Sequence, residues 1–313
     1  MMRPRGEACH RFAGLRVGPP TYTHVVPELP EVEALALDLR GRLDGHAIAK
    51  IHVAQFSALK TFDPPLSAME GTLVDDVSRH GKFLDIEASG VHLVLHLARA
   101  GWVRWRDEVP AIPPKPSPKS TLALRVVLDD GSGLDVTEAG TRKSLAAYVV
   151  RDPQDVPGIA SLGPDPLTDA FTIDVFKAIL EKEGGKQLKG VLRHQGTIAG
   201  IGNAYSDEIL HAARMSPFKP AGHLTDDEVK VLYDALRTTL GDAVERSRGL
   251  AASELKGEKK SNLAVHGRTG KPCPVCGDTV REVSFADSSL QYCPTCQTGG
   301  KPLADRRMSR LLK

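Results

Sequence analysis

Hydrophobic and polar residues alternate along much of the first half of the chain, in short segments separated by turn residues. KFLDIEAS at 82–89 and VHLVLHL at 91–97 change character at nearly every second position, and LALRVVLDDGSGLDVTE at 122–138 does so around a glycine-rich turn. A two-residue period interrupted by turns is typical of antiparallel sheets with one buried face. We therefore expect a β-sandwich domain over residues 27–152. Five prolines within 109–118 indicate an extended surface loop in it.

A helical period of three to four residues appears at the head of this domain and again beyond residue 160. Phe171, Val175 and Ile179 recur at helical spacing, for example. A proline- and glycine-rich stretch at 152–167 separates the two regions. We expect a small helical domain over 153–255. Helices are predicted at 27–41, 169–184, 206–215 and 225–249.

The composition is that of a globular protein, with 41% hydrophobic and 26% charged residues. No apolar run approaches the roughly 18 residues of a membrane span. Residues 1–26 lack the apolar core of a secretory signal. These features predict a cytoplasmic protein with no membrane partner.

The net charge of +2 conceals a gradient along the chain. Residues 256–313 hold eleven Lys and Arg against five Asp and Glu, a balance of +6. Subtraction from the totals of 41 and 39 leaves 30 against 34, or −4, in the part before them. A basic terminal module on a mildly acidic body is expected of a protein that binds a polyanion. A solvated basic tail explains the charge equally well.

Four of the five cysteines form two C-x-x-C pairs with sixteen residues between the pairs. In a cytosolic chain this spacing predicts a tetrahedral zinc site, and a redox pair or two disulfides is the alternative. We expect one structural zinc ion held by Cys273, Cys276, Cys293 and Cys296.

Two turns carry residues that could contact a phosphate. The GIGN sequence at 200–203 has glycines that let backbone N–H groups approach an anion at the start of a helix, and Asn203 adds a side-chain N–H. Tight helix packing explains the same glycines. Lys82 follows Gly81 at the start of a predicted strand. Such a lysine is either solvated or, in a groove, a ligand for a phosphate or carbonyl group.

Four motifs occur in an order that resembles one known family. PELPEVE at 27–33, HGKFL at 80–84, AGIGNAYSDEIL at 199–210 and HGRTGKPCPVCG…YCPTCQ at 266–297 are similar to motifs of the formamidopyrimidine-DNA glycosylase (Fpg/Nei) family. The resemblance implies an α+β multidomain fold with DNA bound in a cleft. Its parts would be an N-terminal β-sandwich with a leading helix, a helix–two-turns–helix domain, and a zinc-finger β-hairpin with a basic tail over 256–313.

The same resemblance implies a base-excision repair enzyme. It would be a DNA glycosylase with abasic-site lyase activity, a monomer that removes oxidised or ring-opened bases from damaged duplex DNA. In this family the proline of PELPEVE is the N-terminal residue and its secondary amine attacks C1′ of the damaged nucleotide, so Pro27 is the expected nucleophile. Glu28 is expected to move protons, and Lys82 to hold a phosphate. Asn203, with the backbone at Gly202, is expected to hold another.

Pro27 is internal in this sequence, and an amide nitrogen is not a nucleophile. An α-amino group has a pKa of about 8 and is partly neutral near pH 7. We therefore expect residues 1–26 to be a misassigned translation start, with synthesis beginning at Val26, or a disordered extension that is removed.

Three positions depart from the family's pattern. Ser288 stands where the family has a phosphate-binding arginine in the finger hairpin, with Arg281 as a substitute, and Arg99 replaces a void-filling methionine. The loop TEAGTRKSL at 137–145 keeps basic residues, Arg142 and Lys143, but lacks the family's phenylalanine. These differences leave the preferred lesion open among abasic sites, ring-opened purines and oxidised pyrimidines, with 8-oxoguanine undecided. A non-catalytic DNA-binding protein on the same fold is the alternative.

Overall fold

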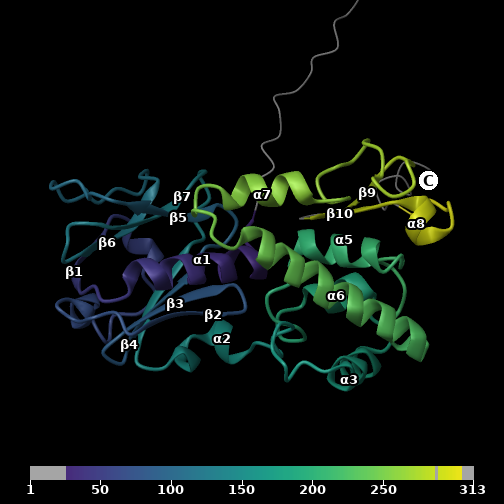
Figure 1. Cartoon of the computed structure of the whole chain (residues 1–313), viewed down its shortest axis with the longest axis horizontal. Coiled ribbons are helices and arrows are strands. Elements are labelled where there is room, and N and C mark those ends of the chain that lie inside the picture. Colours follow the sequence, from purple (N-terminus) through teal and green to yellow (C-terminus); the bar gives the residue numbers. More distant parts are fainter. Residues whose placement is uncertain (1–25, 286–287, 305–313) are drawn as a thin grey trace, which may run out of the picture.

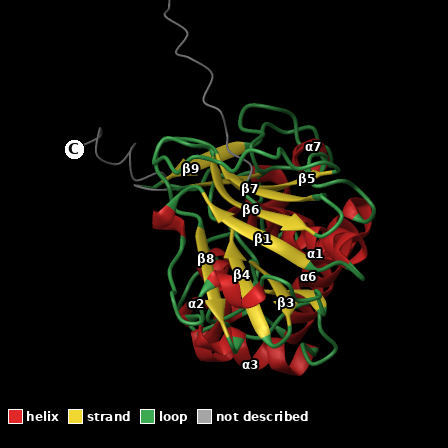
Figure 2. Ribbon diagram, turned by 90° about the vertical axis from the view of Figure 1, so that its left-hand side faces the viewer, coloured by secondary structure: helices red, strands yellow, loops and turns green. Residues whose placement is uncertain are grey.

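The computed structural model describes residues 26–285 and 288–304, so the expectations for residues 1–25 and for the end of the basic tail at 305–313 lie outside the described residues. Two four-stranded antiparallel sheets form the first half of the chain (Figures 1 and 2). One sheet has the order β1 (Ile48–Val53), β6 (Leu122–Leu128), β7 (Gly133–Glu138), β5 (Gly101–Arg106). The other has the order β2 (Asp76–His80), β3 (Phe83–Ala88), β4 (Val91–His96), β8 (Ala146–Val150). The predicted β-sandwich is confirmed.

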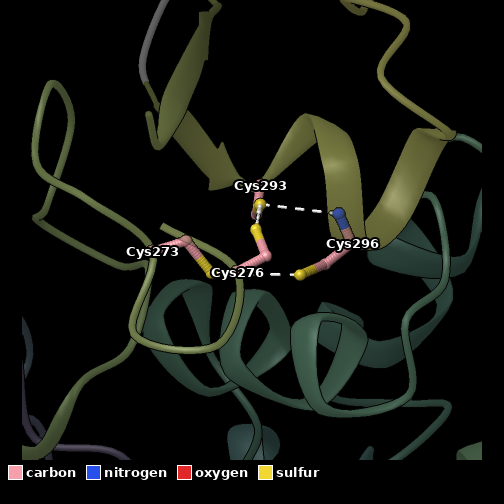
Figure 3. A group of neighbouring side chains, drawn as sticks. All are labelled: Cys273, Cys276, Cys293 and Cys296. Carbon is pink, nitrogen blue, oxygen red and sulfur yellow. Dashed lines mark hydrogen bonds between the residues drawn. The ribbon is translucent and has the colours of Figure 1, made fainter. Parts of the chain in front are cut away.

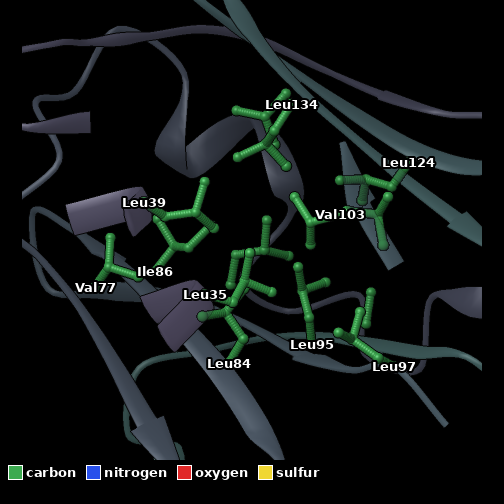
Figure 4. Close-up of a cluster of buried hydrophobic side chains, with 14 of the residues drawn as sticks. Leu35, Leu39, Val77, Leu84, Ile86, Leu95, Leu97, Val103, Leu124 and Leu134 are labelled. Atoms are coloured by element: carbon green, nitrogen blue, oxygen red, sulfur yellow. The ribbon is translucent and has the colours of Figure 1, made fainter. Parts of the chain in front are cut away.

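The leading helix α1 (Leu29–Leu43) is part of the sandwich core. Its buried residues Leu35 and Leu39 pack with side chains of both sheets, among them Leu84 and Leu134 (Figure 4). The helix therefore has one end in the apolar core and the other at the junction with the second half of the chain. It begins and ends two residues later than the range predicted from the sequence.

Helices build the second half of the chain, as predicted, around a core of their own. Three of them overlap the predicted ranges, namely α3 (Ile173–Glu183), α5 (Asn203–Ala212) and α6 (Asp226–Ser247). The longest, α6, starts at a capping box in which the Thr225 hydroxyl and the Glu228 carboxylate accept each other's backbone N–H. Two short helices were not predicted, α2 (Pro157–Ala160) and α4 (Leu188–Arg193). Single 3₁₀ turns lie at Phe56–Ala58, Leu66–Met69, Pro153–Asp155 and Ala221–His223.

The chain after α6 first returns to the sandwich and then forms the finger. Ala252 and Leu255 join the sandwich core, and Leu255 begins α7 (Leu255–Asn262). The finger consists of the hairpin β9 (Arg281–Ser284) and β10 (Ser289–Tyr292) followed by α8 (Pro294–Thr298), next to α5 in Figure 1. Within the described ranges, 26–285 and 288–304, no helix is long and apolar enough to cross a membrane.

Candidate active site

The carboxylate of Glu28 lies at the N-terminus of α5. It is buried and accepts backbone N–H groups from Gly202 (2.6 Å), Ala204 (2.9 Å) and Tyr205 (3.3 Å). The N-terminus of a helix favours an anion, because its first N–H groups have no intrahelical partner. Burial alone would raise the pKa of Glu28, but Lys259, Lys82 and the Ala204 N–H lower it to about 2. Glu28 is therefore ionised at neutral pH.

The glycines of the GIGN turn make this contact possible. A Cβ on Gly202 would lie 2.4 Å from Cδ of Glu28, and a Cβ on Gly200 would lie 2.6 Å from the Leu29 side chain. The Leu29 N–H donates to the Gly200 carbonyl oxygen at 3.0 Å. The GIGN turn thus packs against the first residues of α1. The Gly202 N–H, which was expected to bind a phosphate, donates to Glu28 instead. The anion at this helix is a side chain of the protein.

Pro27 lies on the wall of an open pocket of about 560 Å³. Lys82 and Arg99 line the same pocket, so the structure brings together three residues that were singled out from the sequence. His96 and Gln195 also line it and were not predicted. Gln195 braces the GIGN turn, because its side chain bonds to the Gly200 N–H and the Ile201 carbonyl oxygen.

Lys82 is held in the turn between β2 and β3 by its neighbours. Arg79 donates to the Gly81 carbonyl oxygen (3.0 Å) and pairs with Glu33 (2.6 Å) and Asp165 (2.7 Å), which fixes the turn between α1 and the linker. The Lys82 ammonium makes no hydrogen bond or ion pair with any residue that the structure describes. Burial lowers its pKa, although Glu28 opposes the shift. It is a cation available to a ligand in the pocket.

His96 is a second polar group that faces this pocket. It is the register partner of Phe83 across β3 and β4, and the two rings lie 4.7 Å apart. Burial and the nearby Lys82 lower the pKa of His96 to about 4, so its imidazole is neutral at pH 7. Because His96 stands in a strand with an ordinary alternating pattern, the sequence did not indicate that it faces a pocket.

The loop between β7 and β8 borders the pocket through Ser144. The Glu138 carboxylate accepts the N–H groups of Ser144 (2.7 Å) and Leu145 (3.0 Å), which shapes the loop. Arg142 is exposed on it, whereas the Lys143 ammonium donates to the Glu138 carbonyl oxygen at 2.6 Å. Arg142 is therefore free to contact a polyanion, and Lys143 is engaged within the loop.

Asn203 connects α5 to the finger. Its side-chain amide donates to the Ser289 carbonyl oxygen at 2.8 Å, next to the hairpin turn that contains Ser288. Arg281 pairs with Tyr292 at the opposite end of the same hairpin, roughly 10 Å along the strands from Ser289. Arg281 therefore does not replace the arginine that is absent at position 288.

A buried ionic network that the sequence did not reveal lies behind Pro27. The Lys259 ammonium, on α7, donates to Glu31 (2.7 Å) and to the Val26 carbonyl oxygen (2.9 Å), and it lies 3.8 Å from Glu28. The Tyr205 hydroxyl donates to Glu31 at 2.6 Å. Lys259 stands in a run of charged residues, which is typical of a solvated helix face, so no sequence pattern identified it.

The four cysteines converge as their spacing predicted. Cys273 and Cys276 come from one loop, Cys293 follows β10, and Cys296 lies on α8 (Figure 3). Their sulfur atoms all lie within 4.8 Å of one another, with 3.3 Å between Cys276 and Cys293 and 3.9 Å between Cys273 and Cys296. Tetrahedral zinc with Zn–S bonds of about 2.3 Å places its sulfur ligands about 3.8 Å apart. The donor set and its spacing fit one structural zinc ion.

We expect purified protein to contain one zinc per chain, and Cys276→Ser to lose most of it. Since the finger core is small and built around Cys273 and Cys293, loss of zinc should expose the amides of 264–285 and 288–304 to hydrogen exchange. The amides of α1 should keep their protection, because α1 packs in the sandwich. Metal analysis with exchange mass spectrometry checks both. An unchanged finger in zinc-free protein would contradict the assignment, and Ser253→Ala on an exposed turn is the control.

Comparison with known proteins covers the sandwich, the helices and the finger. The chain matches the formamidopyrimidine-DNA glycosylase N-terminal domain at residues 26–144, the formamidopyrimidine-DNA glycosylase H2TH domain at 162–254, and the zinc finger found in FPG and IleRS at 270–299. The three matches follow the order in which the structure builds its parts.

Individual relatives agree with these matches. An uncharacterized formamidopyrimidine-DNA glycosylase-like protein of Mycobacterium tuberculosis is 61% identical over 153 residues, which are 49% of this chain and 95% of that protein. The formamidopyrimidine-DNA glycosylase of Symbiobacterium thermophilum is 35% identical over 299 residues, covering 90% of this chain and 93% of that protein. Fpg (MutM) of Lactococcus lactis, solved in complex with FAPY-dG containing DNA, superposes with a TM-score of 0.75 at 26% identity, covering 87% of this chain and all of that one. The chain belongs to the formamidopyrimidine-DNA glycosylase family.

Proposed function

We infer that the protein is a base-excision repair DNA glycosylase with abasic-site lyase activity, acting on damaged duplex DNA. The observation that carries this inference is the position of Pro27 on the pocket wall, with the ionised Glu28 behind it and the unpaired Lys82 ammonium beside it. The relatives named formamidopyrimidine-DNA glycosylases, and the Lactococcus lactis complex with FAPY-dG containing DNA, support the substrate class. The active form begins at Pro27.

The reaction begins with the neutral secondary amine of Pro27. Its nitrogen forms a bond to C1′ of the damaged nucleotide, and the base departs with the electrons of its own bond to C1′ and gains a proton. Opening of the sugar ring then gives an iminium ion. This ion accepts electrons as a proton leaves C2′ and the 3′ phosphate is eliminated. A second proton then leaves C4′ as the 5′ phosphate is eliminated. Water releases the sugar fragment and restores the amine.

Glu28 serves this sequence as a carboxylate. Because its pKa is about 2, it accepts a proton in the free protein rather than supplying one. It takes up the proton that the amine loses on forming the new bond and returns it to the ring oxygen of the sugar. Its buried negative charge also stabilises the cationic iminium.

Basic groups around the pocket position the DNA. Lys82 lines the pocket and Arg142 is exposed on the β7–β8 loop, so both can donate to phosphates, and Asn203 lies on the finger side. Arg99, exposed at the pocket rim, enters the space that the extruded nucleotide leaves in the duplex. The reacting groups come from one chain, which supports a monomer. Bacterial relatives support action on the nucleoid in the cytoplasm.

The test is incision of duplex DNA by protein that begins at Pro27. Duplexes with one ring-opened purine, one abasic site or one undamaged base are compared, and the products are resolved by length and end group. We expect the damaged strand to be cut with a phosphate on both flanking ends. Damage-selective binding without incision would instead support the non-catalytic DNA-binding protein, which the serine at 288 favours.

A further inference from the structure

Lys259 is a buried cation close to Pro27, in a segment that none of the three matched domains includes. The matches end at 254 and resume at 270, and α7 lies between them. The residue is 2% exposed. Its helix is fixed to the sandwich, because Leu255 joins the apolar core and the Lys256 ammonium lies 4.6 Å over the Trp102 ring. Lys259 is thus held in place by the helical turn that precedes it.

The Lys259 ammonium is close to the nitrogen that reacts. It lies 2.9 Å from the Val26 carbonyl oxygen. In an amide the oxygen and the nitrogen are about 2.3 Å apart, so the ammonium is within about 5 Å of the Pro27 nitrogen. When the chain begins at Pro27 that carbonyl group is absent. One N–H of Lys259 then has no acceptor, and a positive charge faces the free amine.

We propose that Lys259 is a positioning residue that keeps the Pro27 amine neutral, and so reactive, near pH 7. This proposal rests on the function proposed above. A cation close to an amine disfavours its protonated form, and a carboxylate favours that form. Without Lys259, the ionised carboxylate of Glu28 would face the amine with no buried cation opposing it from this side, and the amine would be protonated more readily.

The other charges around the amine do not replace Lys259. The amine and Lys259 are faced by groups from α1, the β2–β3 turn, β4, the β4–β5 turn, α4, α5, α6, α7 and the finger loop: Glu28, Glu31, Lys82, His96, Arg99, Arg193, Tyr205, Glu208, Arg246, Glu258 and His266. Of these, His96 is neutral at pH 7, and burial raises the pKa of Tyr205 so that it is neutral as well. Lys82 faces the pocket, where a bound phosphate would neutralise it. Lys259 is buried on the opposite side and keeps its charge when DNA binds.

The experiment measures how fast borohydride traps the covalent adduct with abasic-site DNA, over about pH 6 to 9, where an α-amino group titrates. Protein that begins at Pro27 is compared with its Lys259→Met variant under single-turnover conditions. We expect the acidic limb of the rate profile to move to higher pH by about one unit or more, as removal of a unit charge at about 5 Å requires. Lys260→Met, an exposed residue of the same helix, removes the same charge and should leave the limb in place.

Glu31→Gln gives the opposite sign and does not leave a carboxylate unpaired. Removing this carboxylate should move the acidic limb to lower pH. A folded Lys259→Met protein with an unshifted limb would overturn the proposal. If Lys259→Met does not fold, an unshifted limb in Glu31→Gln overturns it instead. Absence of any trapped adduct in the parent protein is a different result, because it refutes the proposed function before the variants are compared.

Discussion

Protein that begins at Pro27 is expected to form a borohydride-trapped adduct with abasic-site DNA, whereas protein that retains Val26 forms at least about 10³-fold less. One additional residue converts the secondary amine into an amide, whose nitrogen lone pair is delocalised into the carbonyl group. The Val26 carbonyl oxygen also takes the hydrogen bond of Lys259. Chemistry at this nitrogen is therefore blocked although the pocket is otherwise unchanged.

The comparison needs two proteins that differ only in the residues ahead of Pro27 and share their fold. One has methionine in place of Val26, which is removed to leave Pro27 first, and the other keeps Met-Val ahead of it; intact mass identifies each. Both should bind abasic-site DNA to a similar extent in the absence of borohydride. Equal trapping by both would show that another amine reacts, and Lys82→Met would then test the lysine whose pKa burial lowers.

Glu28→Gln is expected to reduce trapping and base excision by about 10² to 10⁴. The amide has no charge to balance the iminium, and its NH₂ group would face backbone N–H donors of α5 where the carboxylate now accepts them. Single-turnover trapping measures the first effect. Glu181→Gln, an exposed glutamate on α3, controls for the loss of one negative charge. A folded Glu28→Gln protein that reacts at the parent rate would remove Glu28 from the mechanism.

The same substitution carries a pH signature in stability. The pKa of Glu28 falls from 4.5 to about 2 on folding, a difference that corresponds to about 3 kcal/mol. Since the folded pKa is the lower one, this stabilisation is present above pH 4.5 and is lost as the pH falls toward 2. The stability difference between parent and Glu28→Gln should therefore narrow over that interval in denaturant titrations. If the stability difference does not change with pH, the destabilisation by Glu28→Gln comes from packing and not from the charge of Glu28.

The sequence predicted the layers of this protein because their cause is local. Alternation along β3, β4, β6 and β7 reports which side of a strand meets the core, and the apolar spacing of α3 and α6 does the same for helices. Helices α2 and α4 were missed because four and six residues are too short to show a period. The zinc site was predictable since the four ligands are themselves the signal.

The residues of the candidate active site could be predicted only where they belong to a sequence motif. Pro27 and Lys82 meet in one pocket as the resemblance implied, but the partner of the GIGN turn did not follow from its sequence. Glycine at 202 permits either a phosphate or a carboxylate at the helix end, and only the fold brings Glu28, 174 residues away, to that position. Lys259 could not be predicted from the sequence either, because its burial depends on how α7 packs on the sandwich.

The Glu28 carboxylate also caps α5, and it therefore joins the sandwich half of the molecule to the helical half. Glu28 belongs to the sandwich half, and its carboxylate lies at the first turn of α5. A change in the angle between the two halves on DNA binding would therefore either hinge at another point or break these hydrogen bonds. Bending of the duplex and extrusion of the damaged nucleotide are then conformational changes of the DNA. An undamaged nucleotide, which costs more free energy to remove from the stack, is therefore expected to enter the pocket less readily than a damaged one.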